Sequence, residues 1–221
     1  MKTLLRFGVW SLLLSLTAWQ AQAVPLSDLL GGGSITCGDK IFTNFRLFTT
    51  GGSGGADAPS AAEIFVVPDT SSCGTVNPGP GLLFNSAMWN VNAGQTIDTG
   101  FTFDVIAPGP LITDARLALL SFDAEDGGQI HISESIFVGT NNIVNLSVDS
   151  LTGPFVDWHK FPSGPYSIIT VNKDISLEGH ANGNATLSTF TQHFSQVPEP
   201  ATLALVGLAL LGAGLARLRR G

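Results

Sequence analysis

Short apolar runs alternate with polar, glycine and proline residues along most of the chain, and residues 24–196 contain no helical period longer than three turns. The clearest alternation lies in residues 101–105, where Phe101, Phe103 and Val105 point to one face. Thr102 and Asp104 point to the other face, because side chains of a strand alternate. One face is therefore buried and one is wet, as in an antiparallel sheet, and the pattern predicts an all-β domain.

About nine or ten short strands are expected, separated by residues that favour turns. They cover residues 41–48, 63–67, 101–105, 115–122, 129–138, 143–148, 167–171, 175–177 and 185–194. Gly51–Gly55 is expected to form a flexible loop after the first of them. Strands of this number and spacing favour an antiparallel β-sandwich, either jelly-roll-like or Ig-like.

The first 23 residues have the features of a secretory signal peptide. Lys2 and Arg6 are followed by an apolar stretch over residues 7–18, and Ala21 and Ala23 place small residues at the cleavage positions. We expect signal peptidase to remove residues 1–23. The alternative is an uncleaved N-terminal anchor.

The other end of the chain carries a second apolar segment, residues 201–216, which contains no charge. As a helix it would span about 24 Å, less than the hydrocarbon core of about 30 Å. Two groups of residues flank it: Pro198, Glu199 and Pro200 before it, and Arg217, Arg219 and Arg220 after it. The basic cluster places the C-terminus in the cytoplasm. These features fit either a short membrane anchor or a tail that is removed.

The order of these three parts resembles the PEP-CTERM sorting signal of Gram-negative bacteria, which an exosortase recognises and cleaves. The resemblance implies that residues 197–221 insert transiently into the inner membrane. It also implies that the mature protein, residues 24–196, reaches the cell surface or the extracellular matrix and associates there with exopolysaccharide in a biofilm. More loosely, residues 33–45, 112–115 and 171–177 resemble the ectodomain common among PEP-CTERM proteins, which implies no activity.

The net charge of the predicted mature protein limits its possible partners. Residues 24–196 contain five basic and sixteen acidic residues, a net charge of −11. A domain this acidic would be repelled by nucleic acid, so nucleic acid is excluded as a partner. Basic surfaces and divalent cations fit this charge.

The two cysteines, Cys37 and Cys73, are the only ones in a chain directed to an oxidising compartment. An even number of cysteines in that setting predicts a disulfide. The alternative, a reactive thiol or a metal-binding pair, lacks a second ligand motif.

One acidic stretch has partial metal-ligand spacing. Counting from Asp123, Gly128 is at position six and Glu134 at position twelve, as in an EF-hand loop. Gly127 at position five has no side-chain oxygen, and the flanking residues are expected to be strands, which argues against an EF-hand. Two readings stay open, an acidic solvated turn and a turn that binds Ca²⁺. The candidate ligands are Asp123, Glu125, Asp126 and Glu134.

The sequence contains no coherent catalytic set, so a non-enzymatic protein is expected, with no cofactor other than the Ca²⁺ of the alternative above. Gly51–Gly55 matches G-x-S-x-G, but no helix follows to hold Ser53 in a strained turn. No pair of carboxylates is selected for glycoside hydrolysis. The four histidines are scattered without zinc-binding spacing: His131, His159, His180 and His193.

Trp89, Trp158 and Tyr166 can supply the core, and the two tryptophans have a second reading as a platform that stacks a ligand. The first functional hypothesis is an exported, non-enzymatic surface or matrix protein. The second is a secreted carbohydrate-binding module, assisted by Ca²⁺ at the Asp123 loop, that uses Trp89 or Trp158. A secreted hydrolase is the third.

Overall fold

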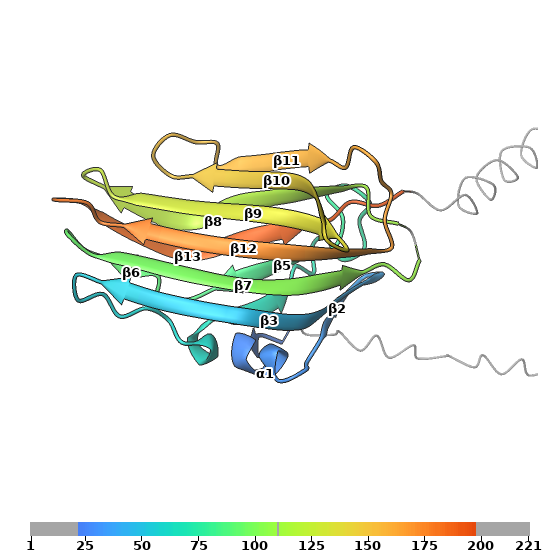
Figure 1. Cartoon of the computed structure of the whole chain (residues 1–221), viewed down its shortest axis with the longest axis horizontal. Coiled ribbons are helices and arrows are strands. Elements are labelled where there is room, and N and C mark those ends of the chain that lie inside the picture. Colours follow the sequence, from blue (N-terminus) through green and yellow to red (C-terminus); the bar gives the residue numbers. More distant parts are fainter. Residues whose placement is uncertain (1–21, 110, 198–221) are drawn as a thin grey trace, which may run out of the picture.

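The computed structural model describes residues 22–109 and 111–197. They form two antiparallel sheets packed face to face, with the six-stranded sheet in front in Figure 1. The all-β sandwich expected from the sequence is therefore confirmed. Several predicted features lie outside the described residues: Ala21, Pro198, Glu199, Pro200, the helix of residues 201–216, Arg217, Arg219 and Arg220. Ala23 is described and exposed, and the first strand begins at the next residue.

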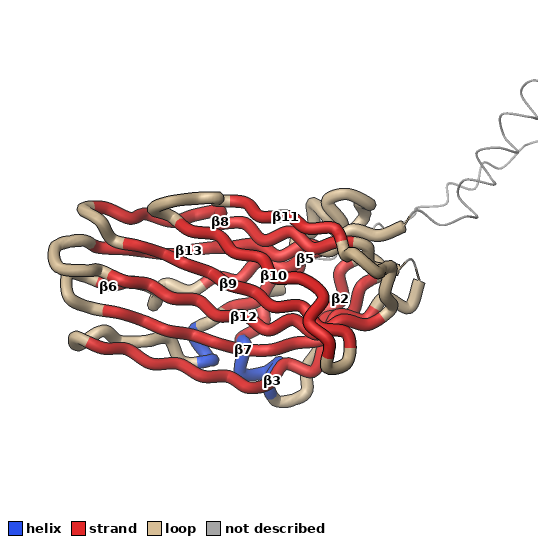
Figure 2. Tube along the Cα trace, turned by 45° about the horizontal axis from the view of Figure 1, so that its top comes forward, coloured by secondary structure: helices blue, strands red, loops and turns tan. Residues whose placement is uncertain are grey.

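Each sheet has a simple hydrogen-bonded order. The seven-stranded sheet runs β1 (Val24–Pro25), β4 (Phe65–Pro68), β5 (Gly81–Asn85), β13 (Asn184–His193), β8 (Asp114–Glu125) and β11 (Val156–Lys160), with β6 (Asn90–Val91) also paired to β13. The six-stranded sheet runs β10 (Asn141–Asp149), β9 (Gln129–Val138), β12 (Ile168–Glu178), β7 (Thr96–Ile106), β3 (Lys40–Ser53) and β2 (Ile35–Cys37). Two short helices, α1 (Leu26–Leu30) and the 3₁₀ helix η1 (Ala61–Glu63), lie beside β3 (Figure 2).

Aromatic side chains from both sheets fill the space between them. Phe84 of β5 and Phe190 of β13 stack with their ring centroids 4.8 Å apart, and Phe84 also contacts Phe101 of β7 across the sandwich. Trp89 is fully buried, and its indole Nε1 donates a hydrogen bond to Thr99 Oγ1 at 3.3 Å. Trp89 therefore belongs to the core and cannot stack a ligand, which corrects one of the two readings of this residue.

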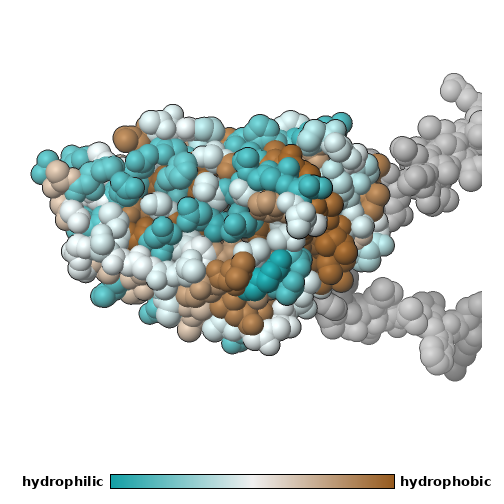
Figure 3. Space-filling view, in the orientation of Figure 1, coloured by the Kyte–Doolittle hydropathy of each residue, from teal (hydrophilic) through white to brown (hydrophobic). Residues whose placement is uncertain are grey.

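The outer face of the six-stranded sheet is polar, as the alternation predicts. Hydrophilic and intermediate residues cover most of this face in Figure 3. Its exposed or half-exposed side chains include Ser133 and Ser135 of β9 and Asn172 and Asp174 of β12. The side chains that alternate with them along each strand point inward, and the apolar ones belong to one continuous core.

Two expected boundaries are wrong. The two strands expected at 167–171 and 175–177 form one strand, β12, which begins at Ile168. The expected break arose because Lys173 occupies a core-facing position where an apolar residue was expected. Gly51–Ser53 continues β3, since all three residues pair with Thr96–Asp98 of the neighbouring β7. A backbone ladder can hold glycines that local propensity would release into a loop. Five strands were not expected from the sequence: β1, β2, β5, β6 and β11.

Lys173 forms a charged pair inside the core. Its Nζ donates a hydrogen bond to Glu134 Oε2 on β9 and a second, of 2.6 Å, to Gln192 Oε1 on β13, so the group joins the two sheets. The ammonium also lies 5.4 Å from the ring centroid of Phe190. Burial raises the pKa of Glu134 and lowers the pKa of Lys173, and the attraction between the two charges opposes both shifts.

Asp149, at the end of β10, holds the following turn. Its Oδ1 accepts hydrogen bonds from the backbone N–H groups of Leu151 and Thr152, both at 2.8 Å, and its Oδ2 accepts one from Gln129 Nε2. Burial opposes ionisation, but these hydrogen bonds outweigh it and lower the pKa of Asp149 below its ordinary value of 3.8. The charged form therefore stabilises the fold.

This shift predicts how stability depends on pH. A carboxyl with a lowered pKa contributes stability above pH 3.8 and loses it as the pH falls through the folded-state pKa. We expect Asp149→Asn to lower the urea midpoint at pH 7 and to differ much less from the wild type near pH 2.5. Urea unfolding of both proteins between pH 2.5 and 7 measures this. A difference that stays constant with pH would contradict the assignment.

Candidate functional site

The loop of residues 69–80, between β4 and β5, is attached to the sandwich at several points. The expected disulfide is confirmed: Cys73 in this loop is bonded to Cys37 at the end of β2, with their Cα atoms 4.7 Å apart. The backbone N–H of Asp69 donates to Gly81 O at 3.0 Å, and that of Gln196 donates to Val76 O at 3.4 Å. The loop is thus joined both to the β2–β3 hairpin and to the end of the domain.

The side chain of Asp69 adds a further attachment. Asp69 Oδ2 lies 2.8 Å from His193 Nε2, and Asp69 Oδ1 accepts a hydrogen bond from Ser71 Oγ at 2.6 Å. Burial opposes ionisation, but the hydrogen bonds from Ser71 and His193 lower the pKa of Asp69. Gly81 makes room for this contact, since a Cβ there would lie 2.3 Å from His193 Cδ2.

Trp158 lies on β11, the edge strand of the seven-stranded sheet, and is 49% exposed. Lys160 is on the same side of the strand because it is two residues further along. Arg116 of β8 is the direct cross-strand partner of Trp158. The indole is therefore presented on the outer face of the sheet, with Arg116 across the strand pair and Lys160 further along β11.

Trp158 forms part of the wall of an open cleft of about 420 Å³. Four segments that are distant in the sequence meet there: the loop of residues 69–80, the start of β8, the end of β11 and the last described residues. The lining consists of Val76, Asn77, Thr113, Asp114, Trp158, Lys160, Ser195, Gln196 and Val197.

Hydrogen bonds fix the walls of this cleft. Asp114 Oδ1 accepts a bond of 3.3 Å from the backbone N–H of Ser195, and the backbone N–H of Thr113 donates to Ser195 O at 3.0 Å. The buried Lys40 donates from Nζ to Gln196 Oε1 at 2.6 Å. An aromatic surface beside fixed hydrogen-bonding groups suits a ligand with both an apolar face and hydroxyl groups.

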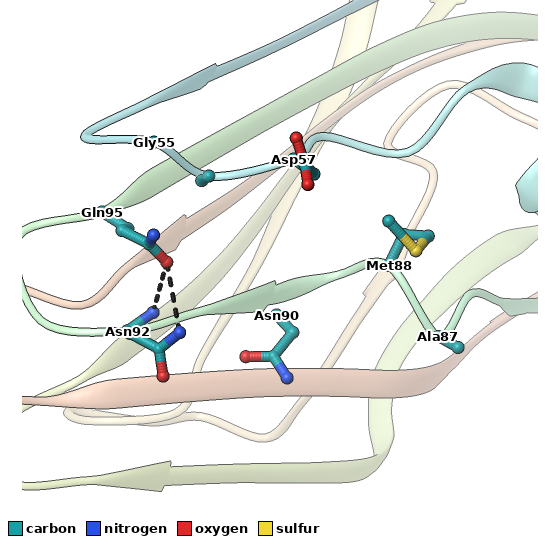
Figure 4. A pocket seen from close by; sticks show the side chains of 8 residues that line it. Gly55, Asp57, Ala87, Met88, Asn90, Asn92 and Gln95 are labelled. Atoms are coloured by element: carbon teal, nitrogen blue, oxygen red, sulfur yellow. Dashed lines mark hydrogen bonds between the residues drawn. The ribbon is translucent and has the colours of Figure 1, made fainter.

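A second pocket, of about 330 Å³, lies at the opposite end of the strands (Figure 4). Amide groups dominate its lining: Gln95 Oε1 accepts hydrogen bonds from Asn92 N at 2.9 Å and Asn92 Nδ2 at 3.4 Å, and Asn90 lies beside them. The carboxylate of Asp57 and the apolar side chain of Met88 also line the pocket. This pocket offers hydrogen bonds but no aromatic surface.

The four carboxylates proposed as calcium ligands do not come together. Asp123, Glu125 and Asp126 are exposed around the end of β8, whereas Glu134 is buried in the core and is bound by Lys173. Glu134 points inward because it alternates with exposed residues on β9. Residues 22–109 and 111–197 contain no group of three or more His, Cys, Asp or Glu side chains suited to a metal ion.

The histidines and the G-x-S-x-G serine are dispersed. Each histidine pairs with a different acidic residue: His131 with Asp149, His159 with Asp157, His180 with Glu178 and His193 with Asp69. Ser53 lies in β3, and its Oγ is 2.7 Å from Thr96 Oγ1 on β7. No histidine is bonded to this serine in the described part of the chain.

Two carboxyl groups meet on the outer face of the six-stranded sheet. Asp174 of β12 is hydrogen-bonded to Asp98 of β7, and burial followed by the neighbouring Asp98 charge raises the pKa of Asp174. Glycosidases place their two carboxyl groups about 5 to 9.5 Å apart, so this direct contact is not their arrangement.

Among the cleft residues, the sequence pointed only to Trp158, as one of two tryptophans that could stack a ligand. The strand that carries Trp158, β11, has a weak pattern because four of its five residues are exposed. The basic residues beside the indole gave no local signal, because Arg116 and Lys160 are 44 positions apart in the sequence and only strand pairing brings them together.

Comparison with known proteins identifies one feature of the sequence. The family model of the PEP-CTERM protein-sorting motif matches residues 196–220. No curated protein sequence matches the chain significantly. Within the described residues, no helix is long and hydrophobic enough to cross a membrane.

Several solved structures share parts of the β architecture at low similarity. One is TmCBM61 in complex with β-1,4-galactotriose, with 15% identity, 67% of this chain and 88% of that chain covered, and a TM-score of 0.32. Another is the enzymatically active domain of tailspike protein 4 of bacteriophage CBA120, with 13% identity, coverages of 68% and 19%, and a TM-score of 0.28. A third is the family 11 carbohydrate-binding module from Clostridium thermocellum in complex with a β-1,3-1,4-mixed-linked tetrasaccharide, with 9% identity, coverages of 69% and 90%, and a TM-score of 0.23. Likenesses this distant carry no argument about the ligand of this chain.

Proposed function

We propose that the β-sandwich acts outside the cell as a non-enzymatic polysaccharide-binding domain. The chain carries a PEP-CTERM protein-sorting motif at residues 196–220, which marks an exported protein processed by an exosortase. The binding site is the cleft beside Trp158. The mature protein belongs to the cell surface or the extracellular matrix and associates there with exopolysaccharide.

The half-exposed indole of Trp158 is the observation that carries this proposal. Leaving a tryptophan in water forgoes the free energy of burying it, and Trp89 in the same domain is fully buried. The C–H groups of one face of a pyranose ring can cover an indole, while the sugar hydroxyls bond to groups around it. Asn77, Thr113 and Gln196 supply such groups in the cleft.

The proposal leaves out catalysis. The histidines pair with four different acidic residues, and the G-x-S-x-G serine is bonded to a threonine. Calcium is left out of the proposal because Glu134 is bound by Lys173 in the core.

Replacement of Trp158 by alanine tests the site. We expect the affinity for a bound polysaccharide to fall by about 30-fold, the loss typical of a central aromatic contact. The exported protein and its variant are compared by isothermal titration and by affinity electrophoresis against a panel of neutral and acidic polysaccharides.

Phe65→Ala is the matched control, because Phe65 is 41% exposed on β4 near the other edge of the same sheet. We expect this variant to bind like the wild type. Thermal unfolding of both variants separates binding from folding. If the wild type binds no polymer of the panel, or if Trp158→Ala binds unchanged, the proposed function is wrong.

A further inference from the structure

The domain has few basic side chains, and most of them are occupied by acidic or polar partners. Lys40 is buried and bonded to Asp39 and Gln196. Arg46 NH2 pairs with Asp104 Oδ1 at 3.0 Å on the outer face of the six-stranded sheet. Lys173 is buried with Glu134. Three of the five lysines and arginines between residues 24 and 196 are thus paired with an acidic residue of the domain.

The two remaining basic residues, Arg116 and Lys160, both lie beside Trp158. Neither forms an ion pair with an acidic residue in the described ranges, residues 22–109 and 111–197. Arg116 is the cross-strand partner of Trp158, so their Cβ atoms are about 5 Å apart. Lys160 lies two residues along β11 on the same face, about 7 Å away. The indole therefore has one basic residue across the strand pair and a second one further along its own strand.

The acidic groups around this site are already bonded or point elsewhere. Asp114 opposes Lys160 across the strands, but it is buried and accepts hydrogen bonds from the Ser195 N–H and the Thr113 hydroxyl. Asp157 points to the other side of β11, where its Oδ2 accepts a bond of 2.8 Å from the Ser147 N–H. Asp123 lies seven residues from Arg116 along β8, which is about 23 Å.

We propose that the polysaccharide bound at the Trp158 cleft is anionic and carries uronate carboxylates, which Arg116 and Lys160 bind. This inference rests on the proposed function and adds the chemical class of the ligand. A pyranose ring packs on the indole, and its carboxylate, or that of the next sugar, meets one of the two basic groups. A guanidinium offers two parallel N–H donors to a carboxylate, so Arg116 supplies the more specific contact.

The charge of the rest of the domain strengthens this assignment. With sixteen acidic and five basic residues, the mature domain repels polyanions over most of its surface. An acidic polymer can approach closely only where positive charge is exposed. The position of Arg116 and Lys160 beside the indole therefore directs such a polymer to the aromatic surface.

The test compares one polymer with and without its charge. The exported protein is titrated with polygalacturonate, alginate and hyaluronate, with their carboxyl-reduced forms, and with dextran sulfate. We expect at least one uronate polymer to bind at least 10-fold more tightly than its reduced form. Arg116→Gln and Lys160→Gln are each expected to lower that affinity about fivefold, and the double variant should bind both forms alike.

Arg46→Gln is the matched control, since it removes a positive charge from the other sheet, and we expect it to leave the affinity unchanged. Equal binding of the acid and reduced forms by the wild type would overturn the anionic assignment but keep the proposed function. Failure to bind any polymer would overturn both. Binding of dextran sulfate as tight as that of the best uronate polymer would overturn the carboxylate assignment.

Discussion

Lys173→Met is expected to lower the free energy of unfolding by about 3 to 5 kcal/mol, the cost of leaving a buried charge without its partner. Both Lys173 and Glu134 have fully buried side chains. Removing the ammonium leaves the Glu134 carboxyl, whose other oxygen has no hydrogen-bond partner, in the core. The variant must then protonate Glu134 or admit water.

The same substitution at an exposed lysine is the control. Lys160→Met on β11 is expected to change stability by less than about 0.5 kcal/mol, as surface substitutions usually do. Urea unfolding at pH 7 measures both variants. A Lys173→Met protein as stable as the wild type would show that the pair is not buried in solution.

A triple variant distinguishes the effect of an unpartnered Glu134 from the effect of removing the whole Glu134–Lys173–Gln192 cluster. Changing Glu134→Leu, Lys173→Met and Gln192→Leu together removes every polar member of the cluster that joins the two sheets. Buried ion pairs replaced by apolar residues of similar size often give proteins of equal or greater stability. We therefore expect the triple variant to be much more stable than Lys173→Met alone.

Removing the disulfide is expected to have the second-largest effect on stability. Cys37 and Cys73 are 36 residues apart, and closing a loop of that length contributes about 4 kcal/mol in the chain-entropy model. The double variant Cys37→Ala/Cys73→Ala should unfold at a correspondingly lower urea concentration.

The loss of the disulfide should also weaken polysaccharide binding, because the loop that it holds supplies Val76 and Asn77 to the cleft. Titration with the polymer that binds the wild type, under conditions where the double variant is folded, measures this second effect. Unchanged stability would contradict the first expectation. Unchanged affinity would show that the hydrogen bonds of Asp69, Val76 and His193 hold the loop without the disulfide.

The predictions that succeeded depended on local sequence pattern, whereas those that failed depended on neighbours in space. β9 was expected at residues 129–138 and has those bounds, because its alternation is regular over ten residues. β12 was divided because Lys173 breaks its apolar pattern, and only the partners Glu134 and Gln192 explain a lysine there. The predicted calcium ligand set that joined Glu134 to the Asp123 turn was also wrong, because Glu134 is the buried partner of Lys173.

The sequence by itself determined the sorting motif, the all-β class and the cysteine pairing, because these depend on local pattern, residue order and the number of cysteines. Only the tertiary structure decided which tryptophan is buried, where Glu134 points and which basic residues adjoin Trp158. These features arise from the pairing of strands far apart in the chain, such as β8 with β11, and from the face that each strand turns to the core. The half-exposed Trp158 beside Arg116 and Lys160, which carries the proposed binding site, is therefore a product of strand pairing.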